Sequence, residues 1–296
     1  MRIAIASGKG GTGKTTVATS LALSLAPCGN VWYVDCDVEA PNGHIFLKPQ
    51  FNQALPAGIR IPKIDPELCS LCGRCVEVCQ FHALAKIGKT ILVFPQLCHG
   101  CGSCTWNCPE QAITEQFTPI GSLALGRTES GLNFAHGILT ISEPMATPVI
   151  RQLKRQQQFT DCDVIVFDAP PGASCSVVET LRGVDFVLLV TEPTPFGLHD
   201  LKQMLGIVSE MGLPAGLIIN RESGAYPPLA ELCASEKLPV LMRIPFNRQY
   251  AEGLAKGQTL IQIAPEYVKL FQEVYDQIST ILNLPGSQAE PNQEKP

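Results

Sequence analysis

Short apolar runs, separated by polar or glycine-rich connections, recur along the chain. Residues 3–6, 31–34 and 164–167 are apolar at every position, which is typical of strands buried on both faces of a parallel sheet. Similar runs cover residues 186–190 and 217–219, and a further, mostly apolar run covers residues 240–244. The pattern therefore predicts an α/β fold built on a mostly parallel sheet.

Helical periodicity occupies the stretches between these runs. Residues 17–25, 148–159, 198–211 and 228–237 are predicted to be helices. A last helix is predicted at residues 266–282, where a broad apolar face opposes acidic residues. Helices that lie on membranes carry mainly lysine and arginine on the polar face, so this helix is expected to pack on the sheet.

A glycine-rich loop lies between the first predicted strand and the first predicted helix. Its pattern is G-x-x-x-x-G-K-[ST], in which glycines let backbone N–H groups approach nucleotide phosphates and the helix N-terminus favours negative charge. We expect Lys14 to reach the β- and γ-phosphates of ATP and Thr15 to hold Mg²⁺. The expected nucleotide-binding residues of the loop are Gly8, Lys9, Gly10, Gly11, Thr12, Gly13, Lys14, Thr15 and Thr16.

Aspartates stand at the ends of two predicted strands. Asp35 and Asp37 follow the strand at residues 31–34, and Asp168 ends the run at residues 164–167. Ligands of open parallel sheets bind at the carboxyl ends of the strands, so these carboxylates are expected beside the phosphates. Asp168 fits the Walker-B arrangement, in which a strand-end carboxylate holds Mg²⁺ through water. For Asp35 and Asp37 the alternative is a role as helix caps only, which Asp also favours.

Two cysteine runs with the same spacing are the second strong signal. The pattern C-x-x-C-x-x-C-x-x-x-C starts at Cys69 and recurs at Cys98. Bacterial two-cluster ferredoxins have this spacing, and there three cysteines of one run and the fourth of the other hold each [4Fe–4S] cluster. Zinc is the alternative, but zinc sites usually close at four ligands from two separated C-x-x-C pairs. The predicted ligands are Cys69, Cys72, Cys75 and Cys108 for cluster 1, and Cys98, Cys101, Cys104 and Cys79 for cluster 2.

Composition limits the classes of function and location. With 296 residues, 45% of them hydrophobic, the chain can form a buried core in one or two domains. A net charge of −5 argues against nucleic-acid binding, which needs a dense basic surface. The one compact basic cluster, Arg151, Lys154 and Arg155, is interpreted as a solvated helix face. Without a recognisable signal peptide or membrane span, a cytoplasmic protein is expected. Thiols stay reduced there, so the thirteen cysteines indicate metal ligation rather than disulfides.

The phosphate-binding loop contains an extra lysine, Lys9, directly after its first glycine. Together with Asp35-Cys36-Asp37 and the Asp-Ala-Pro-Pro-Gly that starts at Asp168, the loop resembles that of the MinD/ParA superfamily of P-loop ATPases. The resemblance implies an ATP-dependent homodimer in which Lys9 reaches the nucleotide of the other subunit. It also implies that Asp37 orients the attacking water and helps to organise Mg²⁺. The catalytic residues are then Lys9, Lys14 and Asp37, and the Mg²⁺ residues are Thr15, Asp37 and Asp168.

The same resemblance places adenine at the ends of two later strands. Asn220 and Arg221 follow one of these strands, and Pro245 and Phe246 follow the next. All four are interpreted as adenine contacts, with ordinary loop residues as the equal alternative, because a strand-end position is only a weak pointer to a ligand.

The cysteine runs resemble a ferredoxin domain inserted after switch I of such an ATPase. The expected fold is a mostly parallel P-loop NTPase sheet flanked by helices, with an inserted small α+β ferredoxin-type domain. The predicted divisions are residues 1–60 and 114–285 for the ATPase domain, 61–113 for the insert, and 286–296 for a disordered tail. Of the five cysteines outside the two runs, most are expected to be small buried hydrophobes, and no cluster is expected to bridge two subunits at Cys175.

The leading hypothesis is an ATP-hydrolysing dimeric switch coupled to electron transfer or cluster handling through two [4Fe–4S] clusters. Its partner is expected to be an unidentified redox or cluster-accepting protein. One alternative is a ferredoxin-type electron carrier with a vestigial nucleotide site, against which the intact Lys9, Lys14, Thr15, Asp37 and Asp168 argue. Another alternative, an iron-sulfur assembly chaperone, shares every motif with the leading hypothesis.

Overall fold

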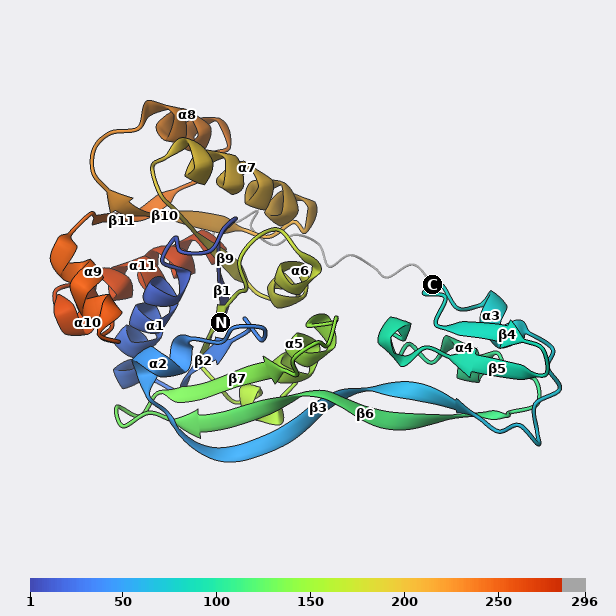
Figure 1. The fold of residues 1–296 in the computed structure, drawn as a ribbon. Coiled ribbons are helices and arrows are strands. Elements are labelled where there is room, and N and C mark those ends of the chain that lie inside the picture. Colours follow the sequence, from blue (N-terminus) through green and yellow to red (C-terminus); the bar gives the residue numbers. More distant parts are fainter. Residues whose placement is uncertain (284–296) are drawn as a thin grey trace.

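The computed structural model describes residues 1–283 and has a nine-stranded sheet at its centre (Figure 1). The strands lie in the order β11-β10-β9-β1-β8-β2-β7-β6-β3. All neighbours from β11 to β7 are parallel, whereas β6 is antiparallel to both β7 and β3. The strands are β1 (Arg2–Ala6), β2 (Val31–Asp35), β3 (Gln50–Ile64), β6 (Ile113–Arg127), β7 (Asn133–Leu139), β8 (Val164–Asp168), β9 (Phe186–Thr191), β10 (Ala215–Glu222) and β11 (Val240–Pro245).

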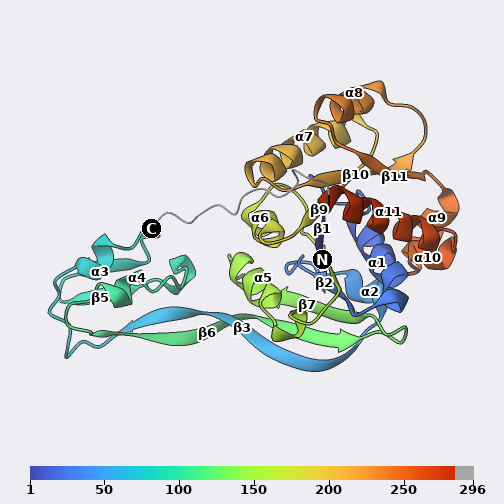
Figure 2. The ribbon, with the colours of Figure 1, turned by 180° about the vertical axis from the view of Figure 1, so that it is seen from behind.

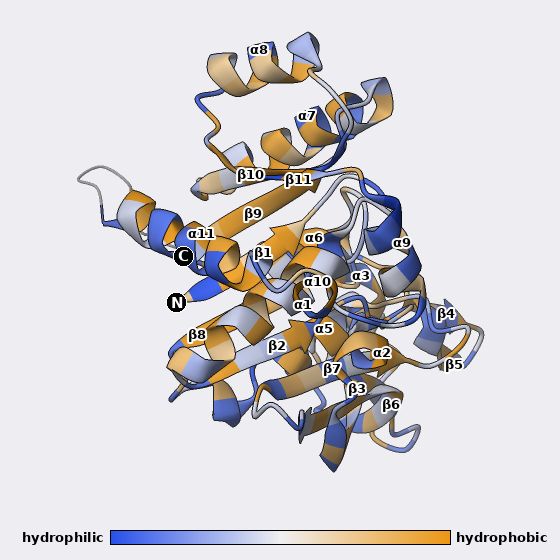
Figure 3. Cartoon of the chain, turned by 90° about the vertical axis from the view of Figure 1, so that its left-hand side faces the viewer, coloured by the Kyte–Doolittle hydropathy of each residue, from blue (hydrophilic) through white to orange (hydrophobic). Residues whose placement is uncertain are grey.

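Helices cover both faces of the parallel part of the sheet, because its strands are apolar on both faces. Ile3 and Ile5 pack into one core with α1, α10 and α11, whereas Ala4 and Ala6 belong to the core under α5, α6, α7 and α8. Figure 3 shows the apolar strands β1 and β9 between these layers. The prediction of a mostly parallel α/β sheet is thereby confirmed. The helices are α1 (Lys14–Leu25), α2 (Gly43–Leu47), α5 (Thr147–Lys154), α6 (Cys175–Leu181), α7 (Pro195–Glu210), α8 (Pro227–Ser235), α9 (Arg248–Ala255), α10 (Leu260–Ile263) and α11 (Tyr267–Leu282).

A long antiparallel ribbon of β3 and β6 extends the sheet beyond its parallel part. The two strands pair from Gln50 and Arg127 to Ile64 and Ile113, but only residues 121–127 of β6 also pair with β7. The remaining half of the ribbon projects away from the sheet, as Figures 1 and 2 show from opposite sides. Two prolines, Pro56 and Pro62, lie within β3, which a strand at the edge of a sheet tolerates because one side of it needs no donors.

The ribbon carries a small unit at its far end, residues 65–112, which we call the cysteine lobe. It contains a hairpin of β4 (Leu84–Ile87) and β5 (Thr90–Val93) and two one-turn helices, α3 (Arg74–Glu77) and α4 (Ser103–Trp106). Its small core contains Leu84, Ile91 and several cysteines. The predicted domain boundaries at residues 60/61 and 113/114 both fall within the ribbon, and the division into domains stays a prediction.

No helix within residues 1–283 is long and apolar enough to cross a membrane. The tail predicted at residues 286–296 lies outside the described part of the chain.

Candidate nucleotide site and cysteine centres

The phosphate-binding loop joins β1 to α1 at the carboxyl edge of the sheet. Gly11 and Gly13 have φ angles of 80° and 96°, in the left-handed region that glycine adopts at no steric cost. A Cβ atom at Gly13 would lie 2.2 Å from Nδ2 of Asn220. That nitrogen donates a hydrogen bond of 2.7 Å to the carbonyl oxygen of Thr12. The predicted residue Asn220, at the end of β10, therefore holds the loop from behind.

Lys14 begins α1, and its ammonium group lies inside the curve of the loop. The residue is 7% exposed, and Nζ donates to the carbonyl oxygen of Lys9 at 3.4 Å. Burial lowers the pKa of Lys14, and the nearby carboxylates of Asp168 and Asp37 oppose this effect. A buried cation between carboxylates and free N–H groups is an environment that a polyphosphate can complete.

Asp168 ends β8 beside Lys14 and is almost fully buried. Its Oδ2 accepts a hydrogen bond of 2.8 Å from the Tyr33 hydroxyl, whereas its Oδ1 has no hydrogen-bond partner among residues 1–283. Burial raises the pKa of Asp168 to about 6, against opposing effects of the Thr15 hydroxyl and Lys14. A buried carboxylate oxygen without a donor, next to the Thr15 hydroxyl, fits Mg²⁺, which prefers oxygen ligands.

Asp35 and Asp37 have different surroundings although they are two residues apart. Asp35 is fully buried and accepts three N–H groups, from Asp37 at 3.1 Å, Asn42 at 3.0 Å and Gly43 at 2.9 Å. It therefore organises the loop that leads into α2, in the capping role that the sequence left open. Asp37 is half-buried and close enough to Lys14 to affect its pKa. Of the two, Asp37 remains the group that can face a phosphate.

A cavity next to the loop brings together all four residues predicted to contact adenine. It encloses about 460 Å³, including its open mouth. Asn220 and Arg221 line it from β10, Pro245 and Phe246 from the end of β11, and Gly13 and Thr16 connect it to the phosphate-binding loop. Sequence reasoning missed the other side of this cavity, which helix α9 and its neighbours supply through Asn247, Tyr250, Ala251, Leu254 and Leu260.

The predicted catalytic residue Lys9 has a contact that the sequence did not indicate. Its Nζ lies 3.8 Å from Oε2 of Glu192, whose other oxygen pairs with Nη1 of Arg221 at 2.6 Å. Glu192 follows β9, so the two cations belong to one short ion-pair chain across the mouth of the site. Asp200 of α7 was also missed. It packs so closely against Gly8 that a Cβ there would lie 2.5 Å from the Cβ of Asp200.

The eight cysteines of the two runs line two separate cavities in the cysteine lobe. In each cavity, the first three cysteines of one run meet the fourth of the other run. Including their open mouths, the cavities have volumes of about 340 and 330 Å³, so they are nearly equal in size. One is lined by Cys98, Cys101, Cys104 and Cys79, and the other by Cys69, Cys72, Cys75 and Cys108.

Backbone donors are repeated around both sets of thiols. The Ala83 amide lies 3.3 Å from Sγ of Cys79, and the Ala112 amide lies 3.3 Å from Sγ of Cys108. These pairs are related by the same 29-residue offset as the two runs. Within residues 1–283, no three cysteine, histidine, aspartate or glutamate side chains are arranged to hold a single metal ion. Four thiols spread around a cavity fit a [4Fe–4S] cube, which fills the space between them, better than zinc.

Two interpretations of the sequence need correction. Arg151 and Lys154 are not simply solvated, because both side chains contact α6, although the Arg151 side chain is still 43% exposed. Arg155 is exposed and has no side-chain partner among the described residues. The five cysteines outside the two runs are not all buried. Cys36 and Cys233 are buried and Cys162 is half-buried, but Cys28 and Cys175 are exposed.

A parallel sheet with a phosphate-binding loop after its first strand and a buried aspartate at the end of β8 defines a P-loop nucleotide-binding protein. A family described as the CobQ/CobB/MinD/ParA nucleotide binding domain matches residues 3–261, and the chain belongs to this family. Membership of this family supports ATPase activity, and so do the phosphate-binding loop, Lys14 and the buried Asp168.

Relatives and solved structures agree with this assignment. An uncharacterized protein of Methanocaldococcus jannaschii is 30% identical over 287 residues, which cover 95% of this chain and 98% of that protein. An iron-sulfur cluster carrier protein of Aquifex aeolicus is 24% identical over 298 residues, covering 95% of this chain and 67% of that protein. The structure of the septum site-determining protein MinD from Pyrococcus horikoshii, complexed with Mg-ADP, has a TM-score of 0.57 at 20% identity and covers 95% of this chain and 97% of that one, so the fold is shared.

Proposed function

We propose that the chain is an ATP-hydrolysing dimeric switch that handles iron-sulfur clusters, or the electrons they carry, through two [4Fe–4S] centres in the cysteine lobe. The observation that carries this proposal is the exchange of cysteines between the two runs, which gives two cavities of nearly equal size with four thiols each. The same chain carries a phosphate-binding loop with its lysine and buried aspartate in place. One polypeptide therefore combines the parts for nucleotide hydrolysis with the parts for cluster binding.

In the ATPase, positioning and charge neutralisation provide most of the catalysis, as in phosphoryl transfer generally. Lys14 and the loop N–H groups bind the β- and γ-phosphates, while Thr15 and Asp168 hold Mg²⁺. Asp37 orients the attacking water and accepts its proton. Lys9 completes the site of a second subunit after leaving Glu192, so hydrolysis depends on dimerisation.

In the cysteine lobe, the thiolates bind the clusters and the nearby amides adjust their properties. Bound clusters supply one-electron chemistry or cargo for a recipient. Amide donors to Cys79 and Cys108 stabilise the charge on sulfur, and hydrogen bonds to sulfur are among the factors that set the reduction potential. Burial raises the pKa of the Cys75, Cys98 and Cys104 thiols, so these cysteines favour the neutral form until iron binds.

The name of the Aquifex relative, an iron-sulfur cluster carrier, favours cluster delivery as a second form of the same function. In electron transfer the clusters stay bound through many ATPase cycles, whereas in delivery they leave the protein. Retention of iron after ATP turnover in the presence of an apo-ferredoxin acceptor distinguishes the two. In both forms the partner is a protein that accepts electrons or clusters, and a cytoplasmic location is expected.

The test is iron and sulfide counting on anaerobically purified variants. About eight irons are expected per wild-type chain, from two cubes of four. Cys72→Ser combined with Cys108→Ser removes two ligands of one proposed cluster, so about four irons should remain. Cys72→Ser combined with Cys79→Ser alters one run but both proposed clusters, so nearly all iron should be lost. The exposed Cys28 provides the control, because Cys28→Ser should retain all of it. Equal losses in the two double variants would contradict the proposed ligand exchange.

A further inference from the structure

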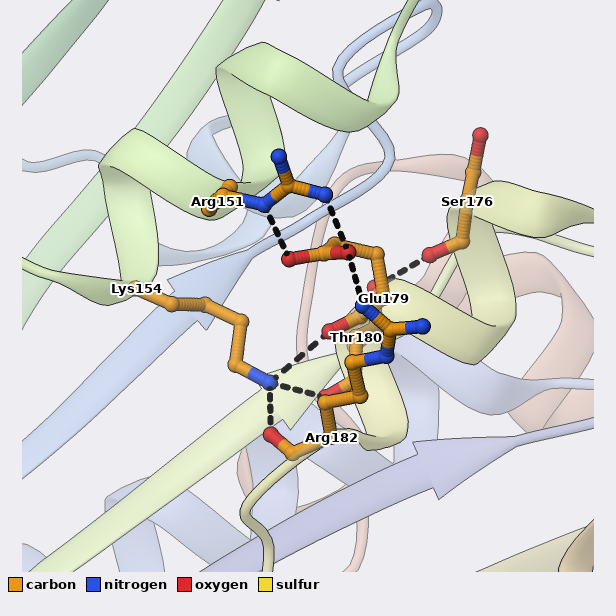
Figure 4. A network of polar contacts seen from close by, with 6 residues as sticks. All are labelled: Arg151, Lys154, Ser176, Glu179, Thr180 and Arg182. Atoms are coloured by element: carbon orange, nitrogen blue, oxygen red, sulfur yellow. Dashed lines mark hydrogen bonds and ion pairs between the residues drawn. The ribbon is translucent and has the colours of Figure 1, made fainter. Parts of the chain in front are cut away.

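Helix α5 is tied to helix α6 by a dense set of polar contacts (Figure 4). Arg151 binds the Glu179 carboxylate with two hydrogen bonds, Nε to Oε1 at 2.9 Å and Nη2 to Oε2 at 3.0 Å. Lys154 donates to the carbonyl oxygens of Glu179, Thr180 and Arg182. These carbonyls lie in the last turn of α6, where a cation is favourable and free acceptors need donors. Two-point arginine–carboxylate pairing fixes the orientation of the partners as well as their distance.

Another face of α5 is tied to the ribbon. The Gln152 side-chain amide makes hydrogen bonds with both backbone groups of Gly58 in β3. Its Oε1 accepts from the Gly58 N–H at 3.1 Å, and its Nε2 donates to the Gly58 carbonyl oxygen at 2.6 Å. The strand register shifts at this point, and Gly58 lies opposite Pro119, which has no N–H to donate. The Gln152 amide therefore supplies partners that the irregular ladder lacks.

Close packing reinforces this contact at the base of the ribbon. Val149 of α5 lies over two glycines, so a Cβ at Gly121 of β6 would be 3.2 Å from it and a Cβ at Gly137 of β7 would be 2.9 Å from it. Helix α5 thus sits directly on the backbone of the strands. A displacement of α5 cannot be absorbed by intervening side chains there, because none separate it from the strands.

Helix α6 is in turn close to the nucleotide site. The loop after Asp168 bonds to the phosphate-binding strand and loop, from the Ala169 amide to the Ile5 carbonyl at 3.0 Å and from the Gly172 amide to the Ser7 carbonyl at 3.1 Å. Only two residues separate Gly172 from Cys175, the first residue of α6. Loops at this position of P-loop proteins are ordered by the γ-phosphate and released on hydrolysis.

We propose that α5 is a connecting element that transmits the nucleotide state from α6 to the ribbon and so to the cysteine lobe, with Arg151 and Gln152 as its two positioning residues. This inference rests on the proposed function and adds the route of coupling. It gives a role to Arg151 of the basic cluster, which was interpreted from the sequence as a solvated helix face. Arg155, the one member without a side-chain partner among the described residues, lies outside the route.

The charges on α5 support a rigid connection at physiological pH. Burial lowers the pKa of Lys154 to about 8, so the ammonium group is mostly protonated at pH 7 and keeps its three acceptors. Hydrogen bonding to Arg151 lowers the pKa of Glu179, so the carboxylate is ionised when the pair forms. Helix α5 is therefore held against α6 by specific contacts rather than by loose packing.

Amide hydrogen exchange on the full chain tests this route with and without Mg²⁺ and a non-hydrolysable ATP analogue. In the wild type, the analogue should slow exchange in residues 8–16 and change it in ribbon residues 54–62 and 115–123. Gln152→Glu places an acceptor, instead of the amide donor, against the Gly58 carbonyl. Arg151→Gln removes the two-point pair with Glu179 and leaves the Lys154 and Gln152 contacts in place. In both variants the response at residues 8–16 should persist, whereas the ribbon response should be lost.

Matched controls come from the same region. Gln157→Glu and Arg155→Gln make the same charge changes at exposed positions, and both should keep the ribbon response. A ribbon response that survives in Gln152→Glu and Arg151→Gln would overturn the route, and so would a wild-type ribbon that does not respond while residues 8–16 do. Absence of any response at residues 8–16 in the wild type would instead overturn nucleotide binding, and with it the proposed function.

Discussion

Replacing Asp168 by asparagine should stabilise the nucleotide-free protein while abolishing Mg²⁺-dependent ATP hydrolysis. The carboxylate is buried, and its Oδ1 lacks a hydrogen-bond partner within residues 1–283. Burial raises its pKa from an ordinary value of 3.8 to about 6. Asparagine has nearly the same shape as the protonated acid and can still accept the hydrogen bond from Tyr33, but it carries no charge to hold Mg²⁺.

The size and sign of the stability change follow from linkage. A folded state with a raised carboxyl pKa binds protons more tightly than the unfolded chain, so stability falls as pH rises from about 4 to about 6. At 1.36 kcal/mol per tenfold change in acidity, the rise from 3.8 to about 6 makes ionised Asp168 destabilising by about 3 kcal/mol at pH 7. At pH 4.5 Asp168 is protonated in the folded protein, and by the same relation its contribution destabilises the folded state by only about 1 kcal/mol.

Urea unfolding of nucleotide-free protein, in the presence of a chelator, measures this difference at pH 7 and pH 4.5. Asp168→Asn should have a higher free energy of unfolding than the wild type at pH 7, and most of this difference should disappear at pH 4.5. Asp276→Asn, at an exposed position of α11, is the matched control and should change stability by less than about 0.5 kcal/mol at either pH. An Asp168→Asn protein that is no more stable than the wild type at pH 7, or whose advantage does not depend on pH, would refute the reasoning.

Two further predictions concern other parts of the molecule. Lys14→Ala should abolish ATP binding, whereas Lys9→Ala should retain much of the binding but lose analogue-dependent dimerisation and hydrolysis. Sedimentation with a non-hydrolysable ATP analogue checks this prediction, and normal dimerisation of Lys9→Ala would contradict it. Gly137→Ala would place a Cβ 2.7 Å from Val38 and 2.9 Å from Val149. This overpacking should lower the free energy of unfolding by about 1–3 kcal/mol, as measured by urea unfolding. A urea midpoint equal to that of the wild type would contradict the prediction.

The parts of the fold that local pattern determines were predictable from the sequence. Continuous apolar runs predicted the buried parallel strands, because burial on both faces leaves no polar position. The phosphate-binding loop was recognisable because its glycines and lysine must keep fixed spacing around a phosphate. The pairing of the fourth cysteine with the opposite run was also expected, and the structure places the thiols accordingly around two cavities.

Features that depend on contacts distant in sequence could not be predicted in this way. Pro56 and Pro62 lie inside β3, and the edge position that lets this strand tolerate them depends on the whole sheet rather than on local pattern. The spacing of Arg151 and Lys154 was that of an exposed helix face, and only the packing of α6 against α5 gives them partners 25 or more residues away. The residues of α9 that line the cavity beside the phosphate-binding loop carry no motif, because an apolar surface needs no fixed spacing of residues.

The nucleotide site and the proposed cluster centres should influence each other, and redox titration of the clusters with and without the ATP analogue tests this coupling most directly. A nucleotide-dependent change at the lobe must alter the reduction potentials, because these depend on charge, solvent access and hydrogen bonds to sulfur. Reciprocity then requires cluster reduction to change ATP affinity by the same factor, with typical coupling energies of about 1–3 kcal/mol. We predict potentials that shift on analogue binding and an affinity that shifts equally on reduction. Potentials that coincide within error, together with an unchanged ATP affinity, would contradict the account.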